Sequence, residues 1–208
     1  SAGSYLEDQD QWWLPGVFRS VSLRYLPDFS IEDLWIDTDY EAGQGFATLE
    51  LRVRGAQSET LEANLVIEGL GTSVLTLARG EDGRYRSENI GLGTVQPWSA
   101  QSPKLYAACV QVAGEGGRLT EERHLRLGFR RVEIVDGVLH ANGQPLTLNG
   151  VNRHEIRADE GRVFSEEFAR TDLELMKSMG INAIRTSHYP PHPRLLDLAD
   201  EIGLWVML

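Results

Sequence analysis

The spacing of apolar residues changes near residue 130, and this change constrains the fold more than any other feature of the sequence. Over residues 27–130, apolar and polar residues alternate, which is the period of half-buried antiparallel strands. The clearest run comprises Ala47, Leu49, Leu51 and Val53. Glycine-rich polar clusters such as "EAGQG" and "GEDGR" separate the runs and predict turns. We therefore expect an immunoglobulin-like β-sandwich of two sheets over this range.

Residues 131–208 follow a different pattern, in which strands alternate with helices. Asp136-Gly137 and Asn142-Gly143 are strong hairpin signals near the start of this region. Strands are then expected in "LTLNGVNRHE", "INAIRTS" and "LWVML". The short links between these strands and the intervening helices predict a parallel sheet with right-handed crossovers.

The two helices between these strands have recognisable beginnings and ends. Ser165 can cap the first helix and Gly180 can end it, whereas Pro193 opens the second helix. Gly203 is expected to end the second helix. The first helix is expected to bury Phe168, Leu175, Met176 and Met179. The second is expected to bury Leu195, Leu198, Ala199 and Ile202.

Two consecutive strands of the predicted parallel sheet end in clusters of polar residues. The first cluster comprises Asn152, Arg153, His154 and Glu155, and the second comprises Arg185, Ser187, His188 and Tyr189. Ligands of parallel α/β folds bind at the carboxyl ends of strands, so these clusters predict a functional site. The alternative is a structural network that caps the sheet. A zinc site is not favoured, because no short paired spacing such as H-E-x-x-H links the histidines.

Arg185 is the most informative of these residues, because it comes at the end of an otherwise apolar strand. An unpaired buried charge is costly, so Arg185 is expected to need an anionic partner. Glu155 is one candidate, and a carboxylate on a strand outside this sequence is another.

Composition excludes several kinds of partner. The chain has 208 residues and a formal net charge of -11, so it should repel phosphate backbones and not bind nucleic acid. No apolar run is long enough to span a membrane, and the start lacks the pattern of a signal peptide. We therefore expect a cytoplasmic protein that does not bind membranes. The single cysteine, Cys109, is expected to be a buried thiol.

The closing stretch "NAIRTSHYPPHPRLLDLADEIGLWVM" (Asn182–Met207) resembles the signature of glycoside hydrolase family 2 along its whole length. "GVNRHE" fits the preceding barrel strand of that family. "LEDQDQWWLPGVFRSVSL" (Leu6–Leu23) resembles the end of the sugar-binding domain of the large β-galactosidases. "PWSAQSPKLYAACVQV" resembles a stretch of their sandwich domain. The resemblance therefore covers essentially the whole chain, in order.

This resemblance implies an internal piece of a longer, multidomain polypeptide. Residues 1–26 are expected to be the C-terminal end of a jelly-roll sugar-binding domain, including its last strand. Residues 27–130 are the expected sandwich, and residues 131–208 are expected to be the first three strands of a (β/α)₈ TIM barrel. The implied activity is retaining hydrolysis of terminal, non-reducing β-D-galactose residues by a homo-oligomer. Both catalytic glutamates are expected downstream, so the isolated chain is predicted to be inactive.

The resemblance also implies roles for particular residues. His154 and His188 match residues that hydrogen-bond the galactosyl hydroxyls, and Arg185 matches an arginine near the nucleophile. Asp10 matches an aspartate that reaches the galactose 6-hydroxyl region and a sodium ion. The supporting residues are expected to be Asn152, Arg153, Glu155 and Tyr189. The family also implies magnesium, whose ligands are expected outside this sequence.

Two alternatives stay open at this point. β-Glucuronidases and β-mannosidases share the general plan, although the "EDQDQWW" and "HYPPHP" segments favour a β-galactosidase. A non-catalytic immunoglobulin-like module, for carbohydrate binding or as a spacer, needs no chemistry at the strand ends. One stretch departs from the family pattern, because Ile156-Arg157-Ala158 replaces the histidines and proline that often follow "NRHE". The rim of the site is therefore expected to differ from that of close relatives.

Overall fold

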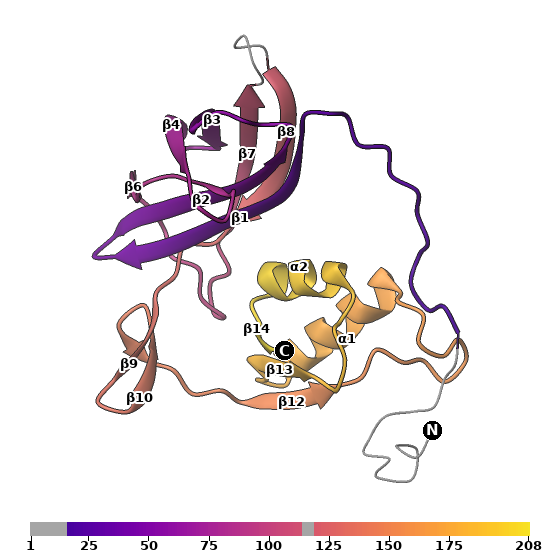
Figure 1. Ribbon diagram of the computed structural model, residues 1–208. Helices are drawn as coiled ribbons and strands as arrows, with labels where there is room; N and C mark the ends of the chain where they lie inside the picture. Colours follow the sequence, from indigo (N-terminus) through magenta and orange to yellow (C-terminus); the bar gives the residue numbers. More distant parts are fainter. Residues whose placement is uncertain (1–15, 114–118) are drawn as a thin grey trace. The chain divides into compact units, whose positions relative to one another are not determined.

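The computed structural model describes residues 16–113 and 119–208, and the chain divides into two compact units (Figure 1). One unit comprises residues 24–146. The other joins residues 147–208 to the preceding segment that ends at residue 23. No helix in the described ranges is both long enough and apolar enough to cross a membrane.

Residues 24–146 form an antiparallel β-structure. Its strands are β1 (Ser30–Glu41), β2 (Gln44–Arg54), β3 (Thr60–Ile67), β4 (Gly71–Arg79), β5 (Tyr85–Arg86), β6 (Ile90–Thr94), β7 (Tyr106–Ala113) and β8 (Leu119–Leu127). They pair in the order β1-β2-β5-β4-β3-β7-β8, and β6 pairs with β2. The short strand β5 pairs with both β2 and β4, so hydrogen bonds connect all eight strands into one folded sheet. The prediction of two separate sheets is therefore refined to two layers joined through β5.

A single apolar core fills the space between these layers. In β2, every second side chain from Ala47 to Val53 is buried, which confirms the predicted alternation. The same core receives the alternating residues Leu61, Ala63, Leu65 and Ile67 of β3 and Val110 and Val112 of β7. Phe129 is fully buried and meets the ring of Tyr106 edge-on, with 5.4 Å between ring centroids. Such an aromatic pair adds to the stability that the buried area provides.

The three strands β9 (Val132–Val135), β10 (Val138–Ala141) and β11 (Gln144–Pro145) form two consecutive hairpins. Asp136 and Gly137 have φ values of 50° and 79°, and Asn142 and Gly143 have values of 52° and 76°. Two successive positive φ angles are what a type I′ turn requires, so both predicted hairpins are confirmed.

Asn142 also explains why these hairpins belong with the sandwich and not with residues 147–208. Its side-chain oxygen accepts a hydrogen bond of 3.0 Å from the Arg131 backbone N–H. Its side-chain nitrogen donates a hydrogen bond of 3.0 Å to the Trp98 carbonyl. The compact unit that contains the sandwich therefore includes these hairpins and extends to residue 146.

Substitution of Asn142 should separate its two contributions. Asn142→Gly keeps the positive φ but loses both side-chain hydrogen bonds, whereas Asn142→Ala also adds strain in the left-handed region. We expect unfolding free energies to fall by about 1–2 kcal/mol for glycine and by about 1 kcal/mol more for alanine. Urea unfolding of the three proteins measures this order. Equal stability of all three would show that the turn does not hold the hairpin.

Residues 147–208 contain a parallel sheet and two helices. The elements are β12 (Gly150–Arg153), α1 (Glu166–Ser178), β13 (Ala183–Thr186), α2 (Pro193–Ile202) and β14 (Trp205–Met207). The strands lie side by side in the order β12-β13-β14, and both pairs are parallel. The predicted strand–helix alternation is confirmed, as is the start of a sheet with parallel strands (Figure 1).

The helix ends follow the predicted signals. Ser165 caps α1, since its hydroxyl accepts a hydrogen bond of 3.3 Å from the Phe168 N–H. His192 caps α2 through a hydrogen bond of 3.1 Å from the Arg194 N–H to its Nδ1. Gly203 ends α2 with φ at 85°, a conformation that glycine adopts without steric cost.

The predicted face of α1 is wrong in part. Phe168, Leu175 and Met179 are exposed, whereas Ala169 and Leu173 are buried and Met176 is partly buried against the same core. These last three residues are separated by four and three positions, so they fall on one helical face. The prediction assumed that the large apolar residues of α1 pack inward, but the buried face of this helix includes the small residue Ala169.

The strand predicted within residues 16–26 is not present, because these residues have no helix or strand in the structure. Val21 and Leu23 are 86% and 102% exposed, so the apolar alternation there is not buried against another element of the described chain. A strand needs a hydrogen-bonded neighbour, and none of the described strands pairs with this segment. The expected last strand of a jelly-roll domain is therefore not observed.

Candidate functional site

The parallel register decides which polar residues at the strand ends share a face. Asn152 of β12 lies opposite Arg185 of β13, which in turn lies opposite Met207 of β14. Arg153 lies opposite Thr186, one position further along. Because neighbouring residues of a strand point to opposite faces, Asn152 and Arg185 share one face and Arg153 has the other.

Arg153 is consequently separated from the predicted site. Its side chain is only 5% exposed and donates a hydrogen bond of 3.1 Å to Asp172 on α1. This ion pair ties the end of β12 to the helix that covers the sheet. Its position indicates a structural role for Arg153 between β12 and α1.

Two histidines meet beyond the strand ends. The rings of His154 and His188 lie edge to face, with centroids 5.9 Å apart and planes at 84°. Tyr189 lies next to the same ring, with 6.1 Å between its centroid and that of His154. The fold therefore brings together residues from both predicted clusters, which are separated by more than thirty positions in the sequence.

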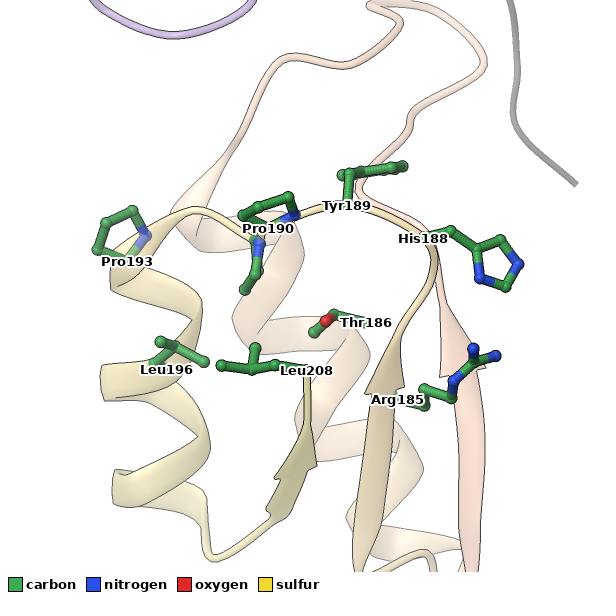
Figure 2. Close-up of a pocket in the computed structure, with 9 residues that line it drawn as sticks. Arg185, Thr186, His188, Tyr189, Pro190, Pro193, Leu196 and Leu208 are labelled. Carbon is green, nitrogen blue, oxygen red and sulfur yellow. The ribbon is translucent and has the colours of Figure 1, made fainter.

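A cavity of about 510 Å³ opens beside the end of β13 (Figure 2). Its lining comprises Arg185, Thr186, His188, Tyr189, Pro190, Pro191, Pro193, Leu196 and Leu208. Figure 2 shows the Arg185 guanidinium and the His188 ring on the same side of β13 and the loop that follows it. Leu196 and Leu208 lie on the other side. The volume and the mixed lining suit a small polar ligand that also presents apolar surface, as a sugar does.

Glu155 occupies the centre of a set of contacts, which we call the Glu155 network. Its side chain is 5% exposed and forms an ion pair of 2.5 Å with Arg19. Its other carboxylate oxygen accepts a hydrogen bond of 2.8 Å from the His192 N–H. The Glu155 backbone N–H donates a hydrogen bond of 2.9 Å to the Tyr189 hydroxyl. Glu155 therefore holds the segment that follows His188 at two points, Tyr189 and His192.

Aromatic contacts extend this network. The Arg162 guanidinium lies 4.1 Å from the Tyr189 ring centroid and 4.6 Å from that of Phe18. The His192 ring stacks on Phe164 with centroids 4.0 Å apart. These contacts join the segment of residues 16–23 to the loop that follows β13. No local pattern in the sequence predicts a role for Arg19, Phe18 or Arg162.

Of the two partners expected for Arg185, Glu155 is wrong, and a carboxylate outside this sequence stays a prediction. Glu155 pairs with Arg19, and Arg185 is exposed with no carboxylate partner in residues 16–113 and 119–208. An exposed guanidinium loses little hydration, so Arg185 needs no partner within the described residues. Arg185 therefore presents its charge at the cavity.

Asp10 lies outside the described residues, so the structure does not test its predicted contact with sugar or sodium. The magnesium expectation likewise stays a prediction. Asn152 is exposed on the face that it shares with Arg185, whereas Tyr189 lines the cavity and bonds to Glu155. Of the residues expected to support the site, Tyr189 and Glu155 thus have defined contacts with it.

Two family models match this chain and together cover most of it. The model described as "Glycosyl hydrolases family 2" matches residues 29–130. The model described as "Glycosyl hydrolases family 2, TIM barrel domain" matches residues 132–208. These matches assign the sandwich and the parallel strands to the same class of proteins, the glycosyl hydrolases. The chain belongs to family 2 of that class.

Individual relatives carry two different names. The chain is 48% identical over 208 residues to a β-galactosidase of an Arthrobacter species, covering 100% of this chain and 19% of that protein. It is 38% identical to a β-galactosidase of Photobacterium profundum, covering 99% of this chain and 21% of the relative. The apo structure of Bacteroides uniformis β-glucuronidase 3 matches with a TM-score of 0.73 and 28% sequence identity. The match covers 91% of this chain and 24% of that one. The chain thus spans about a fifth of the curated relatives' length.

Proposed function

We propose that this chain supplies part of the sugar site of a β-galactosidase, which removes terminal β-D-galactose residues with retention of configuration. One observation carries the proposal: His154, His188 and Arg185 gather at the carboxyl ends of parallel strands, beside the cavity. In α/β barrels the ends of several strands supply the groups that act on the ligand. The names of the curated relatives support galactose as the sugar.

The three side chains suit different parts of this task. Imidazole nitrogens donate or accept hydrogen bonds, so His154 and His188 can bind sugar hydroxyls on one side of the ring. Hydrogen bonds that strengthen in the transition state raise the rate, whereas uniform binding does not. The Arg185 guanidinium adds a fixed positive charge, which would keep a neighbouring glutamate ionised as a nucleophile.

The described residues do not place a pair of catalytic carboxylates at this site. A retaining glycosidase needs two carboxyl groups about 5–5.5 Å apart. Glu155 is the acidic residue of the two strand-end clusters, and its oxygens already bind Arg19 and the His192 N–H. We therefore assign Glu155 a structural role and not that of nucleophile.

The purified 208-residue chain should not hydrolyse a nitrophenyl β-galactoside, because binding groups without a carboxylate pair cannot break the glycosidic bond. Release of nitrophenol over buffer measures this directly. A Glu155→Gln variant is the matched control. Turnover by the chain that this variant abolishes would contradict the proposal, because Glu155 would then be catalytic.

The choice between galactose and glucuronate can be tested in a full-length family 2 enzyme that carries this sequence. The Asp10 carboxylate is proposed to lie near carbon 6 of the sugar, where glucuronate has its own carboxylate. Like charges at such a distance repel, so kcat/KM for nitrophenyl β-galactoside should exceed that for the β-glucuronide by about 10²-fold or more. Asp10→Asn should narrow this ratio. A preference for the glucuronide would favour the β-glucuronidase alternative.

A further inference from the structure

A second group of ligand side chains belongs to the sandwich unit, whereas the strand-end residues belong to the other unit. Cys109 is on β7, and Glu122 and His124 are on β8. One sulfur, one carboxylate oxygen and one ring nitrogen of these residues all lie within 4.8 Å of one another. In the described part of the chain, no other three His, Cys, Asp or Glu residues bring their ligand atoms so close. The histidines His154, His188 and His192 therefore form no comparable group.

The strand register explains this convergence. Cys109 lies directly opposite His124 in the antiparallel pair of β7 and β8. Glu122 is two positions from His124, so both side chains leave the same face of β8. Ala108 and Val110, the neighbours of Cys109, are buried in the core, so Cys109 belongs to the outer face.

The three side chains are accessible and partly oriented. Glu122 and His124 are exposed, and Cys109 is half-buried. His124 Nε2 lies 3.2 Å from Glu122 Oε1, so a hydrogen bond holds these two side chains together. β8 is the last strand in the pairing order of the described residues, and Glu122 and His124 on it are exposed. An ion can thus reach it from solvent.

We propose that Cys109, Glu122 and His124 form a three-ligand site for a zinc-type divalent transition metal ion, with water in the fourth position. Thiolate, imidazole and carboxylate are the side chains that bind Zn²⁺ in proteins, and four-coordination is its usual geometry. Calcium and magnesium require oxygen ligands, so the thiol and the imidazole argue against them. This site is independent of the proposed sugar site.

The proposed ligand atoms are the Cys109 sulfur, a Glu122 carboxylate oxygen and a His124 ring nitrogen, which all lie within 4.8 Å of one another. A bound dication supplies positive charge at both Glu122 and the sulfur, and the thiol proton leaves as the metal–sulfur bond forms.

Calorimetric titration of the intact chain with zinc chloride tests the proposal. One equivalent should bind, and Cys109→Ser and His124→Ala should each weaken binding by at least about tenfold. His140→Ala is the matched control, because His140 lies in the same unit and bonds to the Val138 carbonyl. It should bind zinc like the original protein.

Cobalt(II) in place of zinc gives a second measurement, since a cobalt–thiolate bond has its own charge-transfer absorption. This band should appear with the original chain and be absent from Cys109→Ser. Thermal unfolding should be the same for all variants, and Glu122→Gln replaces any variant that does not fold. Zinc binding that Cys109→Ser and His124→Ala leave unchanged would overturn the proposal, as would cobalt binding without the thiolate band.

Discussion

Replacement of His188 by alanine, in a full-length family 2 enzyme that carries this sequence, should lower kcat/KM for a β-galactoside by about 10²–10³-fold. His188 lines the cavity beside Arg185, and its ring lies 5.9 Å from that of His154. A hydrogen bond made chiefly in the transition state can contribute about 2.7–4 kcal/mol, which corresponds to this loss in rate. Steady-state kinetics with a nitrophenyl β-galactoside measures the change.

The pattern of the loss distinguishes binding from catalysis. If His188 acts mainly in the transition state, kcat should fall more than KM rises. His188→Ala should leave the melting temperature nearly unchanged, because the side chain is exposed at the cavity. His140→Ala, on the hairpin of the sandwich unit, is the control and should keep full activity. Unchanged kinetics in His188→Ala would limit this residue to a structural role.

Most of the fold could be predicted because it depends on local signals. Alternating apolar residues identified the sandwich strands, and the Asp-Gly and Asn-Gly pairs identified two hairpins by their need for positive φ. The ends of both helices followed from Ser165, Pro193 and Gly203. Each of these features is decided within a few residues of the chain.

The predictions that failed depended on partners far away in the sequence. The stretch "GVFRSVSLRYL" (residues 16–26) suggested a strand, but a strand forms only with a hydrogen-bonded neighbour. The buried face of α1 was misjudged, because the packing of Ala169 and Leu173 depends on α2 and the sheet. Local spacing does not reveal which of two apolar stripes will be covered.

The sequence predicted which strand ends form the candidate site, but it did not predict the contacts between the residues there. Parallel strands present their carboxyl ends at one edge, so the meeting of the two polar clusters followed from the fold. Residue alternation separates Arg153 from Asn152, which the sequence could have indicated. The pairing of Glu155 with Arg19, 136 positions away, could not be read from either segment. Only the three-dimensional structure shows this ion pair.

Replacement of Arg19 by methionine should destabilise the unit that contains residues 147–208, because the buried Glu155 carboxylate then lacks its cation. Removing one partner of a buried ion pair is strongly destabilising. Because Arg19 is partly exposed, we expect the free energy of unfolding to fall by only about 2–3 kcal/mol. Amide hydrogen exchange of residues 147–208 measures the loss in the unit concerned. Arg54→Met, which breaks the more exposed pair with Glu32, should cost less than about 1 kcal/mol.

The double variant Arg19→Met/Glu155→Gln tests whether the two side chains act as a pair. With both charges removed, no unpaired ion stays buried, so the double variant should be more stable than the sum of the single losses by about 1–2 kcal/mol. Additive losses would contradict the ion pair. In a full-length enzyme, Arg19→Met should also lower kcat/KM, because Glu155 then holds the segment that follows His188 less firmly through the His192 N–H and the Tyr189 hydroxyl. Full activity alongside the loss of stability would restrict the Glu155 network to holding the fold.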